Sequence, residues 1–233
     1  MLMSNNGFLY AVSRYKGFYR AAKNSAISLK DYYPDAKITL FCGNPDWIKE
    51  EDYDIFDNIV TENVPNDRRA KLWALDQTPY DLTVYVDADT EIEHEDIQTV
   101  WDQIPEDVDI LFTANRPYNA KITMLSETEE MTEHCGLFLY RSNERTLKLM
   151  RAWYDEYWKQ QDENFDMMHY PEEARYWDTF TMWRLLNLFD FGVKYARFPD
   201  PDAKWNFVSG YKEEELMGHE RIIYHYTIPQ NLL

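Results

Sequence analysis

The chain has 233 residues, of which 45% are hydrophobic and 16% aromatic. This length and composition suit one large α/β domain with a sizeable core and argue against intrinsic disorder. Asp and Glu number 42 against 24 Lys and Arg, a formal charge of −18, which argues against general electrostatic binding to nucleic acid or an anionic membrane. An anionic substrate stays possible, because screening over about 8 Å leaves a site governed by its local charges.

The first sixty residues predict a parallel α/β unit. Apolar runs indicate strands over 8–12 and 37–42, and helical spacing between them indicates a helix from about residue 18 to the stop at 31–34. Strand, helix and strand with a short return form a βαβ unit with a right-handed crossover. A third short strand is expected over 57–60.

A basic helix then precedes the most informative strand. Residues 68–75 predict a helix that ends at Thr78-Pro79 and carries Arg68, Arg69 and Lys71. One interpretation is a solvated helix face. The other is that Arg69 or Lys71 faces phosphate groups.

Residues 82–86, Leu-Thr-Val-Tyr-Val, predict a buried central strand that ends on Asp87 and Asp89. Ligands of α/β sheets lie beyond the carboxyl ends of the strands, so both carboxylates are expected at a ligand site. Residues i and i+2 of a strand share a face, roughly 6.5 Å apart. One carboxylate can therefore bind a hard cation while the other binds a second metal position or a ligand hydroxyl.

The rest of the chain predicts further alternation of helices and strands. In chain order these are a helix over 97–104, strands over 109–113 and 135–140, a helix with the apolar stripe Leu147, Met150, Tyr154, Tyr157 and Trp158, a buried helix over 177–186, and strands over 193–198 and 221–226. The polar segment 115–133 predicts an irregular, mobile loop that separates two halves and could close over a ligand. Glu213–Glu215 predicts an exposed helix face.

Cysteine, glycine and hydropathy patterns limit the compartment and the type of site. Cys42 and Cys135 lie in apolar runs, which predicts buried thiols in a reducing compartment. No signal-peptide pattern is present and no apolar run approaches the roughly 20 residues of a membrane span, so we expect a soluble cytoplasmic protein. None of the seven glycines forms a phosphate-binding glycine-rich loop, so a metal and side chains would have to bind phosphates.

Residues 78–90, which end in Asp87-Ala88-Asp89-Thr90, resemble the metal-binding segment of GT-A-fold glycosyltransferases, especially the glycogenin-like and bacterial galactosyltransferase-like group. Three further segments match in order. Residues 11–15 resemble the nucleoside-binding start, 135–141 the strand beside the acceptor, and 222–225 the strand whose histidine completes the metal site. The resemblance covers about residues 8–228.

This resemblance implies an α/β, GT-A (Rossmann-like) fold with a mixed, mainly parallel central sheet flanked by helices. It implies a single domain over 1–233, with a nucleotide-sugar-binding half over about 1–114. The acceptor-binding half, with the C-terminal metal-ligand strand, would cover about 115–233.

The resemblance also implies roles for individual residues. Asp87, Asp89 and His225 would bind Mn²⁺ or Mg²⁺. The residues expected to contact the nucleotide sugar are Ala11, Ser13, Arg14, Tyr15, Arg69, Lys71, Asp87 and Ala88. Asp178 matches the last acid of the family's Asp-Gln-Asp segment near the reacting sugar, and a helix N-cap is its alternative role. The sequence departs from the family at Trp177, where the family has Gln, and at 227–230, where the family has Gly and Lys.

Trp205 and Asn206 form a candidate sugar-contacting loop, because aromatic faces stack on sugars and asparagine bonds hydroxyl groups. A tryptophan buried in the core is the alternative. His134, next to Cys135, is a weaker candidate for the acceptor side.

The predicted function is metal-dependent transfer of a hexose from a nucleotide diphosphate sugar, with a UDP-sugar favoured, to a hydroxyl acceptor such as a glycan. A divalent ion stabilises the charge that the leaving diphosphate gains, and Asp and His are suitable ligands for Mn²⁺. One alternative is a haloacid-dehalogenase-type phosphohydrolase, since that family also ends an apolar strand on Asp-x-Asp. Another is a non-catalytic nucleotide-sugar binder on the same fold.

Overall fold

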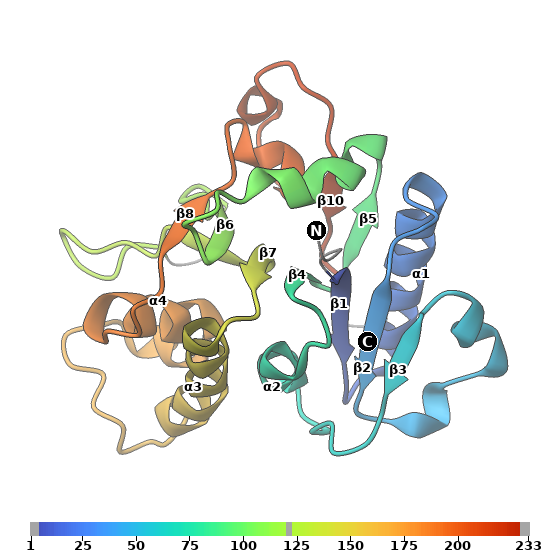
Figure 1. The fold of residues 1–233 in the computed structure, drawn as a ribbon. Coiled ribbons are helices and arrows are strands. Elements are labelled where there is room, and N and C mark those ends of the chain that lie inside the picture. The colour runs from blue at the N-terminus through green and yellow to red at the C-terminus, as the bar shows by residue number, and fades with distance from the viewer. Residues whose placement is uncertain (1–4, 120–122, 229–233) are drawn as a thin grey trace.

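A mixed, mainly parallel sheet passes through the whole molecule (Figure 1). The computed structural model describes residues 5–119 and 123–228, and within them seven strands form this sheet in the order β3-β2-β1-β4-β7-β6-β8. The strands are β1 Asn6–Val12, β2 Ile38–Cys42, β3 Asn58–Val60, β4 Leu82–Val86, β6 Ile110–Ala114, β7 Glu133–Arg141 and β8 Tyr195–Arg197. Only β7 runs antiparallel to its neighbours β4 and β6 in this sheet of the described residues. The predicted fold class is therefore confirmed.

Helices cover both faces of the sheet. The α-helices are α1 Lys16–Tyr32, α2 Ala70–Ala74, α3 Glu144–Gln160 and α4 Asp178–Leu188. Alternate residues of β1 point to opposite faces: Phe8 and Tyr10 pack in the core beneath α1, whereas Leu9 packs in the core beneath α2, α3 and α4. In Figure 1, α1 lies on one side of the strands and α2, α3 and α4 lie on the other.

Strand β4 is the buried central strand that its sequence predicts. All five of its residues are buried, and it pairs in parallel with β1 and antiparallel with β7. Since β1 and β4 are parallel, their carboxyl ends meet at one edge of the sheet. Asp87 and Asp89 follow at that edge.

A second sheet, which the sequence analysis missed, lies directly after Asp89. Its order is β5-β10-β9, with β5 Thr90–Ile92, β9 Phe207–Val208 and β10 Ile223–His225. β10 pairs antiparallel with β5, so that His225 lies opposite Thr90. The sequence predicted a strand over 221–226, which contains β10, but it did not reveal β5, β9 or the pairing among the three, because such short runs carry little periodicity. This pairing nevertheless brings the C-terminal histidine to the end of β4.

Two predicted α-helices are shorter or of another type. The helix expected over 97–104 is a 3₁₀ helix over Glu95–Gln103, and its buried residues Ile97 and Val100 are three positions apart, the repeat of a 3₁₀ turn. The helix expected over 68–75 is α2 followed by a 3₁₀ turn over Leu75–Gln77. The α-helix is therefore confirmed over Ala70–Ala74, whereas the helix expected over 97–104 has the hydrogen-bonding pattern of a 3₁₀ helix.

The described part of segment 115–133 is irregular apart from a bridge between Met124 and Glu130 and the start of β7. Irregularity is therefore confirmed, residues 120–122 lie outside the described residues, and mobility stays a prediction. Both cysteine thiols are free and buried, as predicted. Glu213 and Glu214 are exposed, whereas Glu215 is half-buried because it pairs with Arg116.

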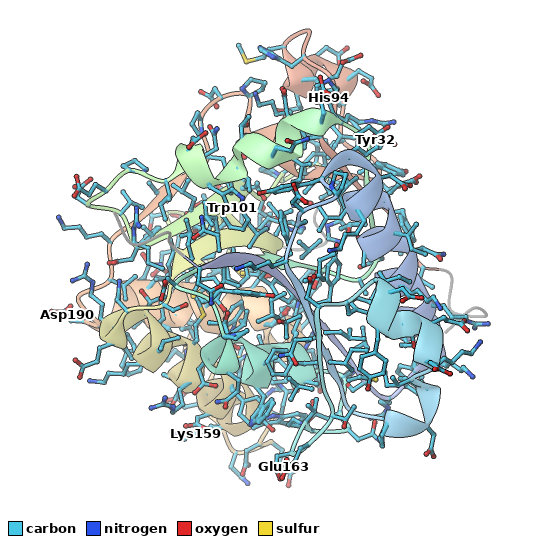
Figure 2. The ribbon with its side chains drawn as sticks, turned by 45° about the vertical axis from the view of Figure 1, so that its right-hand side comes forward. Tyr32, His94, Trp101, Lys159, Glu163 and Asp190 are labelled. Carbon is cyan, nitrogen blue, oxygen red and sulfur yellow. The ribbon has the colours of Figure 1, made fainter. Side chains whose placement is uncertain are left out.

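Charged side chains such as Lys159, Glu163 and Asp190 are exposed and lie at the periphery of the molecule (Figure 2). No helix in the described ranges has the length and apolar character needed to cross a membrane. The cytoplasmic location stays a prediction.

The buried face of α3 differs from the predicted stripe. Trp153, which the stripe did not include, is fully buried, and its indole Nε1 donates to the Asp178 carbonyl at 2.9 Å. Trp158, which the stripe included, is 39% exposed. The stripe prediction was wrong here because aromatic residues occur on both faces of this helix.

Replacing Trp153 with alanine should destabilise the protein by about 3–5 kcal/mol, because it empties a large buried site. Trp158→Ala, on the same helix, should cost less than about 1 kcal/mol. Urea denaturation of the two variants measures the difference. Equal losses would contradict the core described here.

Candidate active site

A pocket of about 170 Å³ opens where β1 and β4 end and α2 begins. It is lined by Ala11, Val12, Ser13, Phe18, Arg68, Arg69, Ala70, Lys71, Tyr85, Asp87, Ala88 and Asp89. The structure thus brings together seven of the predicted site residues: Ala11, Ser13, Arg69, Lys71, Asp87, Ala88 and Asp89.

Asp87, Asp89 and His225 converge beside this pocket. His225 Nε2 lies 3.4 Å from Asp89 Oδ1 and 4.0 Å from Asp87 Oδ2. One ligand atom from each residue lies within 4.8 Å of the other two. A cation with metal–ligand bonds of about 2.0–2.2 Å holds neighbouring ligand atoms slightly closer together than the 3.4 and 4.0 Å between His225 and the two carboxylates. Two carboxylates and an imidazole therefore fit a divalent cation such as Mn²⁺.

His225 and Asp89 shift each other's pKa. Burial favours the neutral imidazole, but the carboxylates of Asp89 and Asp87 outweigh it and raise the pKa of His225. Burial alone would raise the pKa of Asp89, and the interaction with His225 lowers it instead. A metal ligand must present a lone pair, so a cation at this position requires that the ring nitrogen of His225 that faces it carries no proton.

Lys71 connects the candidate metal cluster, which consists of Asp87, Asp89 and His225, to Asp178. Its Nζ lies 3.2 Å from Asp87 Oδ1 and 2.8 Å from Asp178 Oδ2, and Arg69 Nη1 lies 3.5 Å from the same Asp178 oxygen. The Lys71 side chain is only 14% exposed. The solvated-face interpretation is therefore wrong for Lys71 and Arg69, which face into the site.

These ion pairs fix the charge states of the cluster. Burial alone would lower the pKa of Lys71, but Asp178 and Asp87 raise it well above its ordinary value. Burial alone would raise the pKa of Asp178, but Arg69 and Lys71 hold it far below its ordinary value. Asp178 is thus a carboxylate near neutral pH, and Lys71 is an ammonium.

Asp178 is not the N-cap of α4. The N-cap position is Trp177, which makes no side-chain capping bond, and the helix begins at Asp178 itself. An acidic side chain in the first turn is favoured by the helix dipole. The side chain is committed to Lys71 and Arg69, so the capping interpretation is wrong.

A bulge in β7 brings the backbone close to the cluster. The pairing of β7 with β6 shifts after Phe112, and the Asp87 amide donates to the Gly136 carbonyl at 2.8 Å. A Cβ on Gly136 would lie 2.5 Å from His225 Cε1 and 2.8 Å from Asp87 Oδ2. Only glycine fits at this approach.

Four other predicted residues lie away from the pocket lining. Arg14 and Tyr15 are exposed at the start of α1, where the Arg14 guanidinium lies 5.4 Å from the Tyr15 ring centre. Their contact with a nucleotide stays a prediction. Trp205 and Asn206 are each 1% exposed, so neither presents a surface to a sugar in this structure. The alternative of a buried tryptophan is the one that the structure supports, and Asn206 bonds His134 and lies against His225.

Tyr85 is a site residue that the sequence analysis missed. Its hydroxyl donates to Asp87 Oδ1 at 2.5 Å, and burial raises the pKa of this phenol well above its ordinary value, so it stays a donor. A signal was present, since Tyr85 and Asp87 are two residues apart and so share a face of the strand. Arg68, exposed at the pocket, is the third cation of the segment.

Comparison with solved structures reveals similar folds. The chain matches the glycosyltransferase GlyE of Streptococcus pneumoniae TIGR4 with a TM-score of 0.63 and 15% identity, over 97% of this chain and 55% of GlyE. It matches the galactosyltransferase LgtC, solved with donor and acceptor sugar analogs, with a TM-score of 0.57 and 15% identity, over 96% of this chain and 87% of LgtC. The chain has the GT-A fold. It spans about half the length of GlyE.

A third GT-A neighbour is a glycosyltransferase involved in the glycosylation of the major capsid of PBCV-1, with a TM-score of 0.52 and 9% identity, over 95% of this chain and 92% of that one. No protein-family model and no curated protein matches the sequence. At these identities the likeness establishes the fold, and the activity has to be argued from the site.

Asp178→Asn should destabilise the protein by about 3 kcal/mol at neutral pH, because Lys71 and Arg69 lose a buried counter-charge. Asp178 has a lowered folded pKa, so its stabilisation is complete above the unfolded pKa of about 3.9 and is lost as pH falls through the folded value. The gap between wild type and variant should therefore persist down to about pH 4. Urea denaturation over this range measures it.

Asp31→Asn, at an exposed position near the end of α1, is the matched control and should have an effect below about 0.5 kcal/mol. A gap for Asp178→Asn that closes between neutral pH and pH 5 would contradict the lowered pKa.

Proposed function

We propose that the protein is a metal-dependent glycosyltransferase that moves a hexose from a nucleotide diphosphate sugar, with a UDP-sugar favoured, to a hydroxyl acceptor such as a glycan. The observation that carries this proposal is the convergence of Asp87, Asp89 and His225 beside a pocket that also contains a fixed cation, Lys71. The GT-A fold supports it. The expected halves, about 1–114 for the donor and about 115–233 for the acceptor, belong to the same proposal.

In the proposed complex, the nucleoside lies against the end of β1, where Ala11 and Ser13 line the pocket. Asp87, Asp89 and His225 hold Mn²⁺ or Mg²⁺, which when bound supplies positive charge to the leaving diphosphate. Arg68 is exposed at the same pocket and can add charge to the phosphate side. Two residues of the family's C-terminal Gly-Lys region, 229 and 230, lie outside the described residues.

Lys71 and Asp178 are assigned to the reacting sugar. The ammonium of Lys71 is already oriented by Asp87 and Asp178, so no reorganisation is needed when charge develops. Asp178 is a weak proton acceptor because its pKa is far below neutral. We therefore assign it the role of a negative charge that stabilises or captures the sugar cation, and not that of a general base.

The alternatives are less well supported. Each solved structure described above is a glycosyltransferase, and none of them favours a phosphohydrolase. A non-catalytic nucleotide-sugar binder would use the same pocket and the same cation. Turnover of the donor is what separates binder from enzyme.

Thermal shift with UDP and with GDP, each with and without Mn²⁺, tests the donor site. UDP with Mn²⁺ should raise the melting temperature, and UDP alone should raise it much less, because Mn²⁺ held by Asp87, Asp89 and His225 would supply the positive charge that favours the diphosphate. Asp89→Asn should abolish both the Mn²⁺-dependent shift and the hydrolysis of UDP-glucose or UDP-galactose.

Glu91→Gln, an exposed carboxylate in β5 two residues further on, is the control and should keep both. A shift that is independent of the metal and of Asp89 would overturn the proposed function. Metal-dependent binding without any turnover of a panel of UDP-sugars would favour the binder.

A further inference from the structure

Next to the candidate metal cluster, one buried asparagine, Asn206, links His134 to His225. Asn206 Nδ2 lies 3.0 Å from His134 Nδ1, and Asn206 Oδ1 lies 3.0 Å from His225 Nδ1. The two imidazole rings are nearly perpendicular, with ring centres 5.5 Å apart. Asn206 is 1% exposed and His225 is 7% exposed, so water does not compete freely for these bonds.

The direction of the bonds follows from one atom whose role is fixed. The backbone N–H of Gly136 points at His134 Nδ1, with the nitrogens 3.0 Å apart. A backbone amide can only donate, so Nδ1 of His134 must be the acceptor and carry no proton. The single proton of a neutral His134 is then on Nε2.

The orientation of the Asn206 amide follows next. Since His134 Nδ1 accepts, the Asn206 atom that faces it must be the NH₂ group. The same NH₂ group donates to Thr113 Oγ1 at 3.1 Å, which uses both of its hydrogens. The carbonyl oxygen of Asn206 therefore faces His225, where it can only accept.

We propose that Asn206 is a positioning residue that keeps the proton of neutral His225 on Nδ1, so that the Nε2 lone pair faces Asp87 and Asp89. Without Asn206, the nearby carboxylates would favour the opposite tautomer, with the proton on Nε2 and directed at Asp89, 3.4 Å away. The Gly136 amide, His134 and Asn206 thus decide which ring nitrogen of neutral His225 presents its lone pair to a cation.

The effect on cation binding rests on the proposed function, because the Nε2 lone pair matters only to a site that binds a cation. A partner on the second nitrogen of a metal-binding histidine fixes the tautomer and the ring orientation, and its loss typically costs 10–100-fold in metal affinity. The amide of Asn206 would have this effect here.

The tautomers can be read directly by two-bond ¹H–¹⁵N correlation spectra of the ¹⁵N-histidine-labelled protein at alkaline pH without metal. The chain has five histidines, and His134→Gln and His225→Gln assign the two signals. We expect Nδ1–H for His225 and Nε2–H for His134. The opposite tautomer at His225 would overturn the inference.

Asn206→Leu should move the His225 signal toward Nε2–H and weaken Mn²⁺ binding about 10–100-fold, measured from the EPR signal of free Mn²⁺ at a fixed concentration of UDP. Thr113→Val is the matched control. It removes the same bond between Thr113 and Asn206 but leaves the carbonyl of Asn206 on His225, so both the tautomer and the Mn²⁺ affinity should stay as in the wild type.

Equal behaviour of Asn206→Leu and Thr113→Val would overturn the positioning role. If the wild type shows the expected tautomers but binds no Mn²⁺ with or without UDP, the proposed function fails while the assignment of Asn206 stands. The two failures are therefore distinguishable.

Discussion

The ion pair between Lys71 and Asp178 is the interaction on which the rest of the site depends. A carboxylate and an ammonium with so little exposure to water stay charged only when each neutralises the charge of the other. Lys71 also contacts Asp87, the first acid after β4, so one side chain connects the central strand to the start of α4. The pair thus sets the distance between the acids at the sheet edge and the acid expected near the sugar.

The same charges explain how a chain of net charge −18 would accept the diphosphate of the proposed donor. Three carboxylates, Asp87, Asp89 and Asp178, are opposed by two half-buried cations, Arg69 and Lys71, which leaves one negative charge while His225 is neutral. A divalent cation would change this balance to one positive charge. Anion binding would then depend on the cation, whatever the net charge of the surface.

Much of this arrangement could be predicted from the sequence. The strand before Asp87 was clear because residues 82–86 are all aliphatic, β-branched or aromatic, which predicts burial on both faces of the sheet. All five are buried in the structure. Asp87, Asp89 and His225 were predicted to meet only through the resemblance, since the sequence indicated a strand over 221–226 but neither the short β5 nor its pairing with β10. Trp205 and Asn206 were assigned to a sugar because residue type alone does not reveal burial. Their real contacts depend on how residues 202–208 fold over β6 and β7.

The site is also held by backbone bonds that no side-chain pattern could indicate. β5 begins at the residue after Asp89, β10 pairs with it, and the Tyr226 amide donates to the Asp89 carbonyl at 2.9 Å. Thr90 Oγ1 donates to the Asp87 carbonyl at 2.9 Å. The turn between the two acids is therefore fixed from both ends, and His225 is attached to the same small sheet. A site held by strands keeps its ligand atoms close to the geometry of the bound state, which lowers the cost of binding a cation.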